Sequence, residues 1–265
     1  MGAVFEILFV QPIVNILAVF IKLFSLLKIP GVFGFSIIAL TVLIRLILHP
    51  FFKQQLETAK KMQDIKPHLD KLSAKHKKDP KRLQEEQMRL YKEAGLNPAA
   101  GCLFMIIQIP VFIALYQTLN DVLLKGGAEI IKINKLLYTP SLKISSLDPN
   151  FFGLNLAVTP AKGGHWLFYL IPVITAALQY FQVQVSTPQT APSNGPKPAD
   201  AAGGGAHEKS GSGDFQKAMN TQMKYFFPLM IGWFSLNLPI GLALYWNIFS
   251  IFSILQSKQL KVKKI

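Results

Sequence analysis

Residues 225–255 read YFFPLMIGWFSLNLPIGLALYWNIFSIFSIL, an apolar block without a charged side chain. As one helix its 31 residues would extend about 46 Å, too long for one crossing of about 30 Å of hydrocarbon without heavy tilt. The motif Asn-Leu-Pro at 237–239 supplies a break in the middle, because proline cannot continue a regular helix. The block is therefore predicted to form two membrane-spanning helices, residues 222–238 and 240–257.

Basic side chains flank this block at both ends, and they are Lys217, Lys224, Lys258, Lys261, Lys263 and Lys264. Basic flanks favour the cytoplasmic side of a membrane. Both ends of the block are therefore predicted to be cytoplasmic, with the turn outside and residues 258–265 as a basic cytoplasmic tail.

The other apolar residues are also concentrated in blocks, and 51% of the 265 residues are hydrophobic. Residues 32–52, 99–124 and 166–185 are each long enough, or nearly so, to cross a bilayer as a helix. They lack the alternation of a barrel strand. The chain is thus predicted to be an all-α integral membrane protein of a cell inner membrane with a five-span helical core, its N-terminus outside and its C-terminus inside.

Residues 5–28 form a further apolar segment with a narrow polar stripe of Gln11, Asn15 and Lys22, which fall on one face of a helix. One interpretation is an amphipathic helix lying in the membrane interface, and the other is an extra span with one polar face. We favour the interface. No basic n-region with a small-residue cleavage site is apparent, so we expect no cleaved signal peptide.

Residues 53–97 are the most basic stretch, with twelve Lys or Arg against seven acidic residues. Apolar side chains recur every three or four residues on both sides of Asp79-Pro80, which predicts a hairpin of two antiparallel helices. Pro67 is expected to bend or split the first helix. The positive charge predicts a cytoplasmic hairpin, either a solvated helical pair or a docking site for partners or anionic lipid.

The two remaining loops differ in composition. Residues 125–165 are predicted to be extracytoplasmic, although their five lysines against two acids are not the depletion that the positive-inside rule favours. Nineteen of the 28 residues in 186–213 are Pro, Gly, Ser or Ala, so 186–216 is predicted to be a disordered cytoplasmic linker.

Arg45 is the one cationic residue well inside a predicted span. A charge at the bilayer centre costs about 2.5–3.5 kcal/mol on insertion scales. Either the side chain stretches toward the cytoplasmic surface, or it lies in a water-filled polar cavity. Thr41, one turn earlier on the same face, favours the cavity.

The other spans supply neutral polar groups and no obvious carboxylate to pair with Arg45. These groups include Gln108, Gln179, Gln182 and Asn247. Each alone is typical of hydrogen bonding between helices, but together they indicate a wet interior. An intramembrane arginine needs water, backbone carbonyls or a transient anionic partner.

The sequence argues against an enzyme. The five histidines are dispersed without a metal-binding spacing, and neither a G-x-S-x-G elbow nor a phosphate-binding glycine loop is present. No catalytic residue, metal or cofactor is therefore predicted. Cys102 is the single cysteine, which excludes an internal disulfide. The net charge of +14 comes from basic residues that lie beside apolar spans. This placement indicates attraction to membrane lipid and control of membrane topology, and it does not indicate binding to a specific nucleic-acid sequence.

Several stretches together resemble the YidC/Oxa family of membrane protein insertases. They are LTVLIRLILHP at 40–50, MQDIKP at 62–67, YKEAGLNP at 91–98, GCL at 101–103, QIPVFIALY at 108–116, MKYFFP at 223–228 and PIGLALYW at 239–246, with a fainter echo, FGL, at 152–154. The resemblance covers most of residues 5–260 apart from the linker. Phe104 stands where the family commonly has a proline, and the linker is longer than usual.

The resemblance implies a five-span core around a hydrophilic groove that is open to cytosol and lipid and closed to the outside. It implies a groove site of Arg45, Thr41, Gln179, Gln182, Trp246 and Gln108 that binds nascent membrane proteins and releases them laterally into lipid without nucleotide hydrolysis. Partners would be these substrates and membrane lipids, with the ribosome and a Sec translocon as further candidates, and the protein would act as a monomer. The alternatives are a solute or anion transporter that uses Arg45 as its site, and a membrane-anchored scaffold that would not need Arg45.

Overall fold

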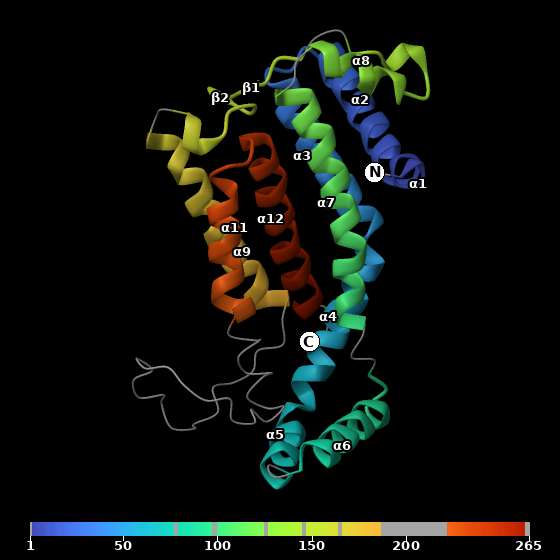
Figure 1. The fold of residues 1–265 in the computed structure, drawn as a ribbon, viewed down its shortest axis with the longest axis vertical. Coiled ribbons are helices and arrows are strands. Elements are labelled where there is room, and N and C mark those ends of the chain that lie inside the picture. Colours follow the sequence, from blue (N-terminus) through green and yellow to red (C-terminus); the bar gives the residue numbers. More distant parts are fainter. Residues whose placement is uncertain are drawn as a thin grey trace.

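The computed structural model describes residues 2–76, 79–96, 100–124, 127–144, 147–163, 166–186 and 222–262, and helices dominate it (Figure 1). The longer helices are α2 (Gln11–Leu26), α3 (Val32–Ile47), α4 (His49–Asp64), α5 (Lys66–Lys75), α6 (Pro80–Glu93), α7 (Ala100–Leu124), α8 (Gly127–Lys135), α9 (Leu170–Ser186), α11 (Phe227–Ser235) and α12 (Ile240–Val262). Short elements are α1 (Ala3–Phe5), the π-helical turns η1 (Glu6–Val10) and η5 (Gln222–Phe226), the 3-10 turns η2 (Pro140–Leu142), η3 (Pro160–Lys162) and η4 (Trp166–Tyr169), and the strands β1 (Asn150–Phe151) and β2 (Leu154–Asn155).

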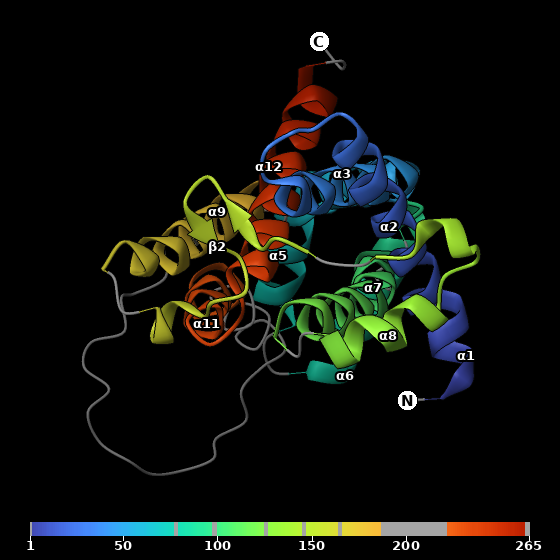
Figure 2. The ribbon, with the colours of Figure 1, turned by 90° about the horizontal axis from the view of Figure 1, so that it is seen from above.

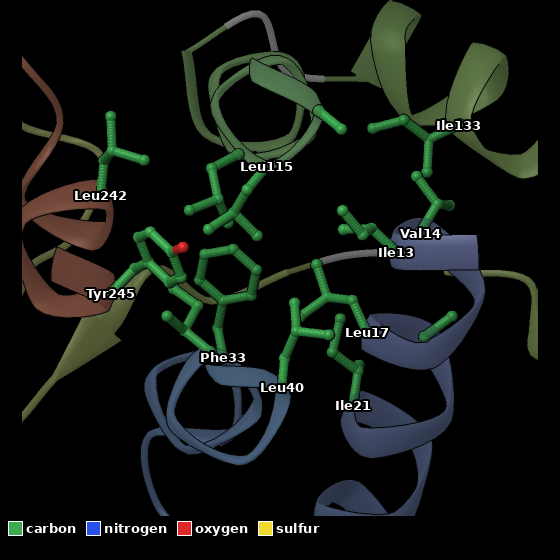
Figure 3. Close-up of a cluster of buried hydrophobic side chains, with 14 of the residues drawn as sticks. Ile13, Val14, Leu17, Ile21, Phe33, Leu40, Leu115, Ile133, Leu242 and Tyr245 are labelled. Atoms are coloured by element: carbon green, nitrogen blue, oxygen red, sulfur yellow. The ribbon is translucent and has the colours of Figure 1, made fainter. Parts of the chain in front are cut away.

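Helix α12 joins the two sides of the bundle. It packs against α9 on one side and against α3 on the other, while α11 packs on α9 and α2 packs on α3. Seen from above, α9 and α11 lie on one side of α12, and α3, α7 and α2 on the other (Figure 2). The buried core gathers apolar side chains from α2, α3, α7, α8 and α12, including Leu17, Phe33, Leu115, Ile133 and Leu242 (Figure 3).

The apolar helices confirm an all-α membrane protein. Three helices are long and apolar enough to cross a membrane, namely Ala3–Leu26, Trp166–Val185 and Ile240–Gln259, and α3 with α4 passes the same test as a bent pair. The outward faces of α9 and α11 expose Val173, Ile174, Phe181, Leu229, Trp233 and Phe234. So many exposed apolar side chains on two packed helices are unfavourable in water and favourable in hydrocarbon.

The first predicted span differs from the structure at its end. Residues 32–52 were expected to form one helix, but α3 ends at Ile47 and α4 begins at His49 with a bend of 62° between them. Pro50 explains the bend, because it lacks an amide hydrogen and its ring clashes with the preceding turn. The hairpin's first arm therefore begins before Lys53.

The hairpin at α4–α6 has a small core of its own. Leu69, Tyr91 and Leu96 are buried there, with Met62, Ile65 and Leu90 packed against them. Pro67 lies in the first turn of α5, where the first arm splits as the proline predicts. Arg89 and Glu93 form an exposed ion pair of 2.8 Å on α6.

The polar stripe of the N-terminal helix contacts the segment that follows α8. The Asn15 side chain donates to the carbonyl of Leu136 at 2.9 Å and accepts from the amide of Tyr138 at 2.7 Å. Lys22 donates to the carbonyl of Ser141 at 2.7 Å. The stripe is therefore matched by the protein's own loop, and both the interfacial and the spanning interpretation remain open for this helix.

The segment after α8 caps the turn between α11 and α12. Three backbone hydrogen bonds tie it there: Ala161 donates to Leu236, Ile240 to Val158, and Gly241 to Leu156. The strands β1 and β2 form a two-residue antiparallel pair, and Phe151 of β1 lies against Gly31 and Gly34 at the start of α3. A Cβ at Gly31, whose φ is +74°, would lie 2.7 Å from the ring of Phe151. The ring therefore occupies space that any side chain here would need.

Some expectations lie outside the described residues. They are the disordered linker at 186–216 beyond Ser186, the end of the tail at 263–265, and the structure around Asn97-Pro98.

Candidate functional site

Arg45 of α3 is enclosed in the centre of the bundle. Its side chain is 1% exposed, the lowest exposure of any charged side chain among the described residues. Nη2 donates to the carbonyl of Phe249 on α12 at 3.1 Å. The guanidinium carbon lies 3.6 Å from the ring centroid of Phe249 and 4.9 Å from that of Phe52 on α4. Two aromatic faces and one carbonyl thus surround the cation, an arrangement that is favourable in a desolvated setting.

This environment overturns one of the two alternatives drawn from the sequence. The side chain does not stretch to the cytosolic surface, because it is 1% exposed and the rings of Phe52 and Phe249 cover it. Of the three kinds of partner expected for an intramembrane arginine, a backbone carbonyl is present. The conformation described is therefore a closed one around Arg45.

Thr41 and Gln108 are two more of the predicted site residues, on α3 and α7. Thr41 is 1% exposed, and its hydroxyl donates to the carbonyl of Ile37 within its own helix. Gln108 of α7 donates to the hydroxyl of Tyr245 on α12 at 3.0 Å. Gln108 therefore connects α7 to α12, and Tyr245, which also lies in the core beside Phe33, is a polar group that the sequence analysis did not single out (Figure 3).

Gln179 and Trp246 meet at the contact between α9 and α12. The indole Nε1 of Trp246 donates to Oε1 of Gln179 at 3.1 Å, and the hydroxyl of Ser250 donates to the same oxygen at 3.4 Å. Gln179 is buried. Its single amide oxygen accepts hydrogen bonds from two donors on α12. The structure thus brings together two residues that the family resemblance had only placed in the same groove.

Replacing Gln179 by leucine is expected to destabilise the bundle by about 1–3 kcal/mol, because the donors of Trp246 and Ser250 lose their acceptor. Thermal unfolding in detergent measures this change. Gln182→Leu is the matched control on the same helix, since Oε1 of Gln182 is buried without a hydrogen-bond partner among the described residues. The free energy of unfolding of that variant should be within about 0.5 kcal/mol of the parent's, or higher. Equal losses in both variants would contradict the assigned role of Gln179.

Further polar side chains follow α12 toward its end. Ser250, Ser253 and Ser257 are buried and recur at helical spacing after Trp246. One more pair connects α12 to the bend, where Nε2 of Gln256 lies 3.0 Å from Nδ1 of His49. The sequence analysis missed these residues, although their spacing of three and four was a signal for one polar face.

Several buried amide oxygens in the bundle have no hydrogen-bond partner among the described residues. They are Oε1 of Gln108, Gln182 and Gln256 and Oδ1 of Asn247. A buried polar group without a partner costs about 1–3 kcal/mol. These oxygens are therefore places where water or a polar ligand would be stabilised.

The side chains of the site offer a positive charge and hydrogen-bonding groups. In the described part of the chain, no group of three His, Cys, Asp or Glu side chains is placed to hold a metal ion. A buried guanidinium beside a stripe of amides and hydroxyls can bind an anionic or polar chain by charge and hydrogen bonds.

The chain is similar in sequence to a described protein family and to several curated proteins. A family model described as 60Kd inner membrane protein matches residues 16–264. The inner membrane ALBINO3-like protein 2 of Chlamydomonas reinhardtii chloroplasts is 35% identical over 243 residues, which cover 88% of this chain and 51% of that protein. ALBINO3 of Arabidopsis thaliana chloroplasts is 32% identical over 248 residues, covering 89% and 48%. The membrane protein insertase YidC of Wolinella succinogenes is 31% identical over 250 residues, covering 92% and 37%.

The chain thus spans about half or less of the length of these curated relatives. The matches give no support to the transporter alternative.

Proposed function

The chain belongs to the YidC and ALBINO3 family of membrane proteins, and on that basis we propose that it inserts other membrane proteins into the lipid bilayer. The relative from Wolinella succinogenes is itself named a membrane protein insertase. The observation that carries the proposal for this chain is Arg45, a cation buried at the junction of α3, α4 and α12 beside buried polar side chains.

Arg45 would act as a temporary counter-charge for a substrate's translocated tail. A carboxylate of that tail replaces the carbonyl of Phe249 as the acceptor of Nη2, and a charge-assisted bond is about twice as strong as a neutral one. Binding requires one of the two covering rings to move. Phe52 is the movable one, because it lies in the first turn of α4 just after the 62° bend, whereas Phe249 lies on α12 between α3 and α9.

The polar side chains would shorten the apolar path that the tail must cross. Gln179, Gln182, Trp246 and Gln108 offer amide and indole groups within the bundle, and the unsatisfied amide oxygens favour entry of water once Phe52 moves. The substrate's own apolar helix then partitions into lipid along the exposed apolar faces of α9 and α11. The step needs neither nucleotide nor catalysis.

The membrane arrangement proposed is five spans with the N-terminus outside and the C-terminus inside a cell inner membrane. The basic hairpin α4–α6 then lies in the cytoplasm, where its cationic surface would meet anionic lipid or partners such as the ribosome or a Sec translocon. The N-terminal helix fits this arrangement as an interfacial element tied to the outer loop through Asn15 and Lys22.

Reconstitution tests the proposal. Vesicles that contain only the purified chain should insert a single-span protein with a short acidic tail, judged by protection of the tail from added protease. Empty vesicles and vesicles with an unrelated multi-span protein are the controls. Insertion at the rate of empty vesicles would contradict the proposal.

A further inference from the structure

A cavity whose wall does not include Arg45 lies between the N-terminal helix, α7 and α8. Its volume is about 400 Å³. The apolar part of its wall consists of Phe5, Val10, Val14, Ile133 and Leu136, and the polar part of Glu6, Gln117, Thr118, Lys132 and Lys135. We propose that this cavity binds the headgroup of a phospholipid with a single negative charge, such as phosphatidylglycerol.

The charge of the cavity wall matches such a headgroup. Two lysines and one glutamate give a net charge of +1, and a phosphodiester whose headgroup carries no other charge has −1. Lys132 and Lys135 are three residues apart on α8, so they lie on neighbouring turns of one face. Both line the cavity and are exposed, so an ammonium group can keep contact with water while it binds phosphate.

The surroundings of the cavity select an amphiphile rather than a free anion. The N-terminal helix exposes Val4, Ile7 and Leu8, and α8 exposes Ile131 beside Lys132. Exposed apolar side chains on both elements around a cationic cavity are typical of the boundary between hydrocarbon and headgroups. The acyl chain of a bound lipid can therefore contact these apolar side chains. Inorganic phosphate has no such chain and cannot make this contact.

The depth of the cavity agrees with this boundary. Gln117 lies seven residues before the end of α7 at Leu124, or about 10 Å along the helix axis. Helix α8 lies at the end of the molecule opposite α5 and α6 of the hairpin (Figure 1). The cavity thus lies within the outer part of the bundle, on the side away from the hairpin.

Thermal unfolding of the purified full chain in detergent tests the proposal, with short-chain phosphatidylglycerol as the probe. A ligand that binds the folded state alone raises the unfolding temperature. Phosphatidylglycerol should raise it by several degrees, the phosphatidylcholine of the same chain length by less than half as much, and inorganic phosphate not at all. An equal rise with phosphatidylcholine, or the full rise with inorganic phosphate, would overturn the proposal.

Variants locate the effect. The pair Lys132→Gln and Lys135→Gln should weaken phosphatidylglycerol binding about tenfold or more. The exposed pair Lys143→Gln and Lys162→Gln, outside the cavity wall, removes the same charge and should bind like the parent. Equal weakening by the two pairs would sink the assignment. If the first pair unfolds without lipid, Glu6→Gln decides instead: it raises the net charge of the wall to +2 and should tighten binding severalfold, and unchanged or weaker binding would overturn the proposal.

Discussion

Replacing Arg45 by alanine is expected to reduce insertion of a substrate with an acidic tail by about tenfold to a hundredfold, while the protein accumulates at a near-normal level. A hydrogen bond to a charged group contributes about 1.5–3 kcal/mol, and each 1.4 kcal/mol corresponds to about a factor of ten. Folding should suffer less, because removal of a buried cation also removes its desolvation cost. The protease-protection assay in reconstituted vesicles measures the loss.

Two comparisons separate the role of the buried charge from a general defect. Lys53→Ala removes an exposed cation on α4, eight residues after Arg45, and should insert the substrate as the parent does. The Arg45→Ala change should reduce insertion of a substrate with a neutral tail much less than insertion of the substrate with an acidic tail. Full activity of Arg45→Ala on the acidic substrate would favour a scaffold role that does not need this residue.

Adding a side chain at Gly34 is expected to destabilise the bundle through a steric overlap. A Cβ at this position would overlap the ring of Phe151, which packs edge-on against Phe35 with ring centroids 5.3 Å apart. Gly34→Val should therefore destabilise the bundle by about 1–3 kcal/mol, the usual cost of overpacking. Thermal unfolding in detergent measures the change.

A double variant tests the mechanism of that loss. Phe151→Ala alone should destabilise the protein, but combined with Gly34→Val it should recover part of the stability, because the truncated residue leaves room for the valine methyl groups. Gly2→Ala is the control, since a Cβ there meets no atom within 4 Å. Strictly additive losses would show that the Phe151 ring is not what Gly34 accommodates.

Local signals in the sequence predicted most of the helices. The Asn-Leu-Pro motif at 237–239 separates α11 from α12, and Pro67 separates α4 from α5, as expected from proline alone. The exception is the end of the first span. There the apolar pair Phe51-Phe52 continued the hydropathy pattern past Pro50, so hydropathy outweighed the proline in the prediction and placed the boundary too late.

Contacts between distant segments could not be predicted. The stripe of Gln11, Asn15 and Lys22 was visible as one helix face, but its partners at 136–141 are about 120 residues away in the sequence. Hydrophobic periodicity shows which face of a helix is polar, but it does not show which distant segment contacts that face.

The same limit applies to the site. Arg45 and Thr41 follow from a charge and a hydroxyl one turn apart in an apolar span. The aromatic rings that enclose the guanidinium could not be inferred, because Phe52 and Phe249 are 197 positions apart and each is an ordinary apolar residue in its own segment. The buried serines of α12 were overlooked because serine is only weakly polar and common in apolar helices.

Accessibility of a cysteine at position 41 tests most directly whether water from the cytosolic side can reach the level of Arg45. In a Cys102→Ser background, Thr41→Cys should react with a membrane-impermeant thiol reagent added from the cytosolic side, and not from the outside. Adding Phe52→Ala should speed the reaction severalfold, because the Phe52 ring covers the guanidinium of Arg45. Arg45 lies one helical turn after position 41. Ser36→Cys, buried nearer the start of α3, should stay unreactive from both sides. A cysteine at position 41 that is inert from both sides, with or without Phe52, would contradict the account.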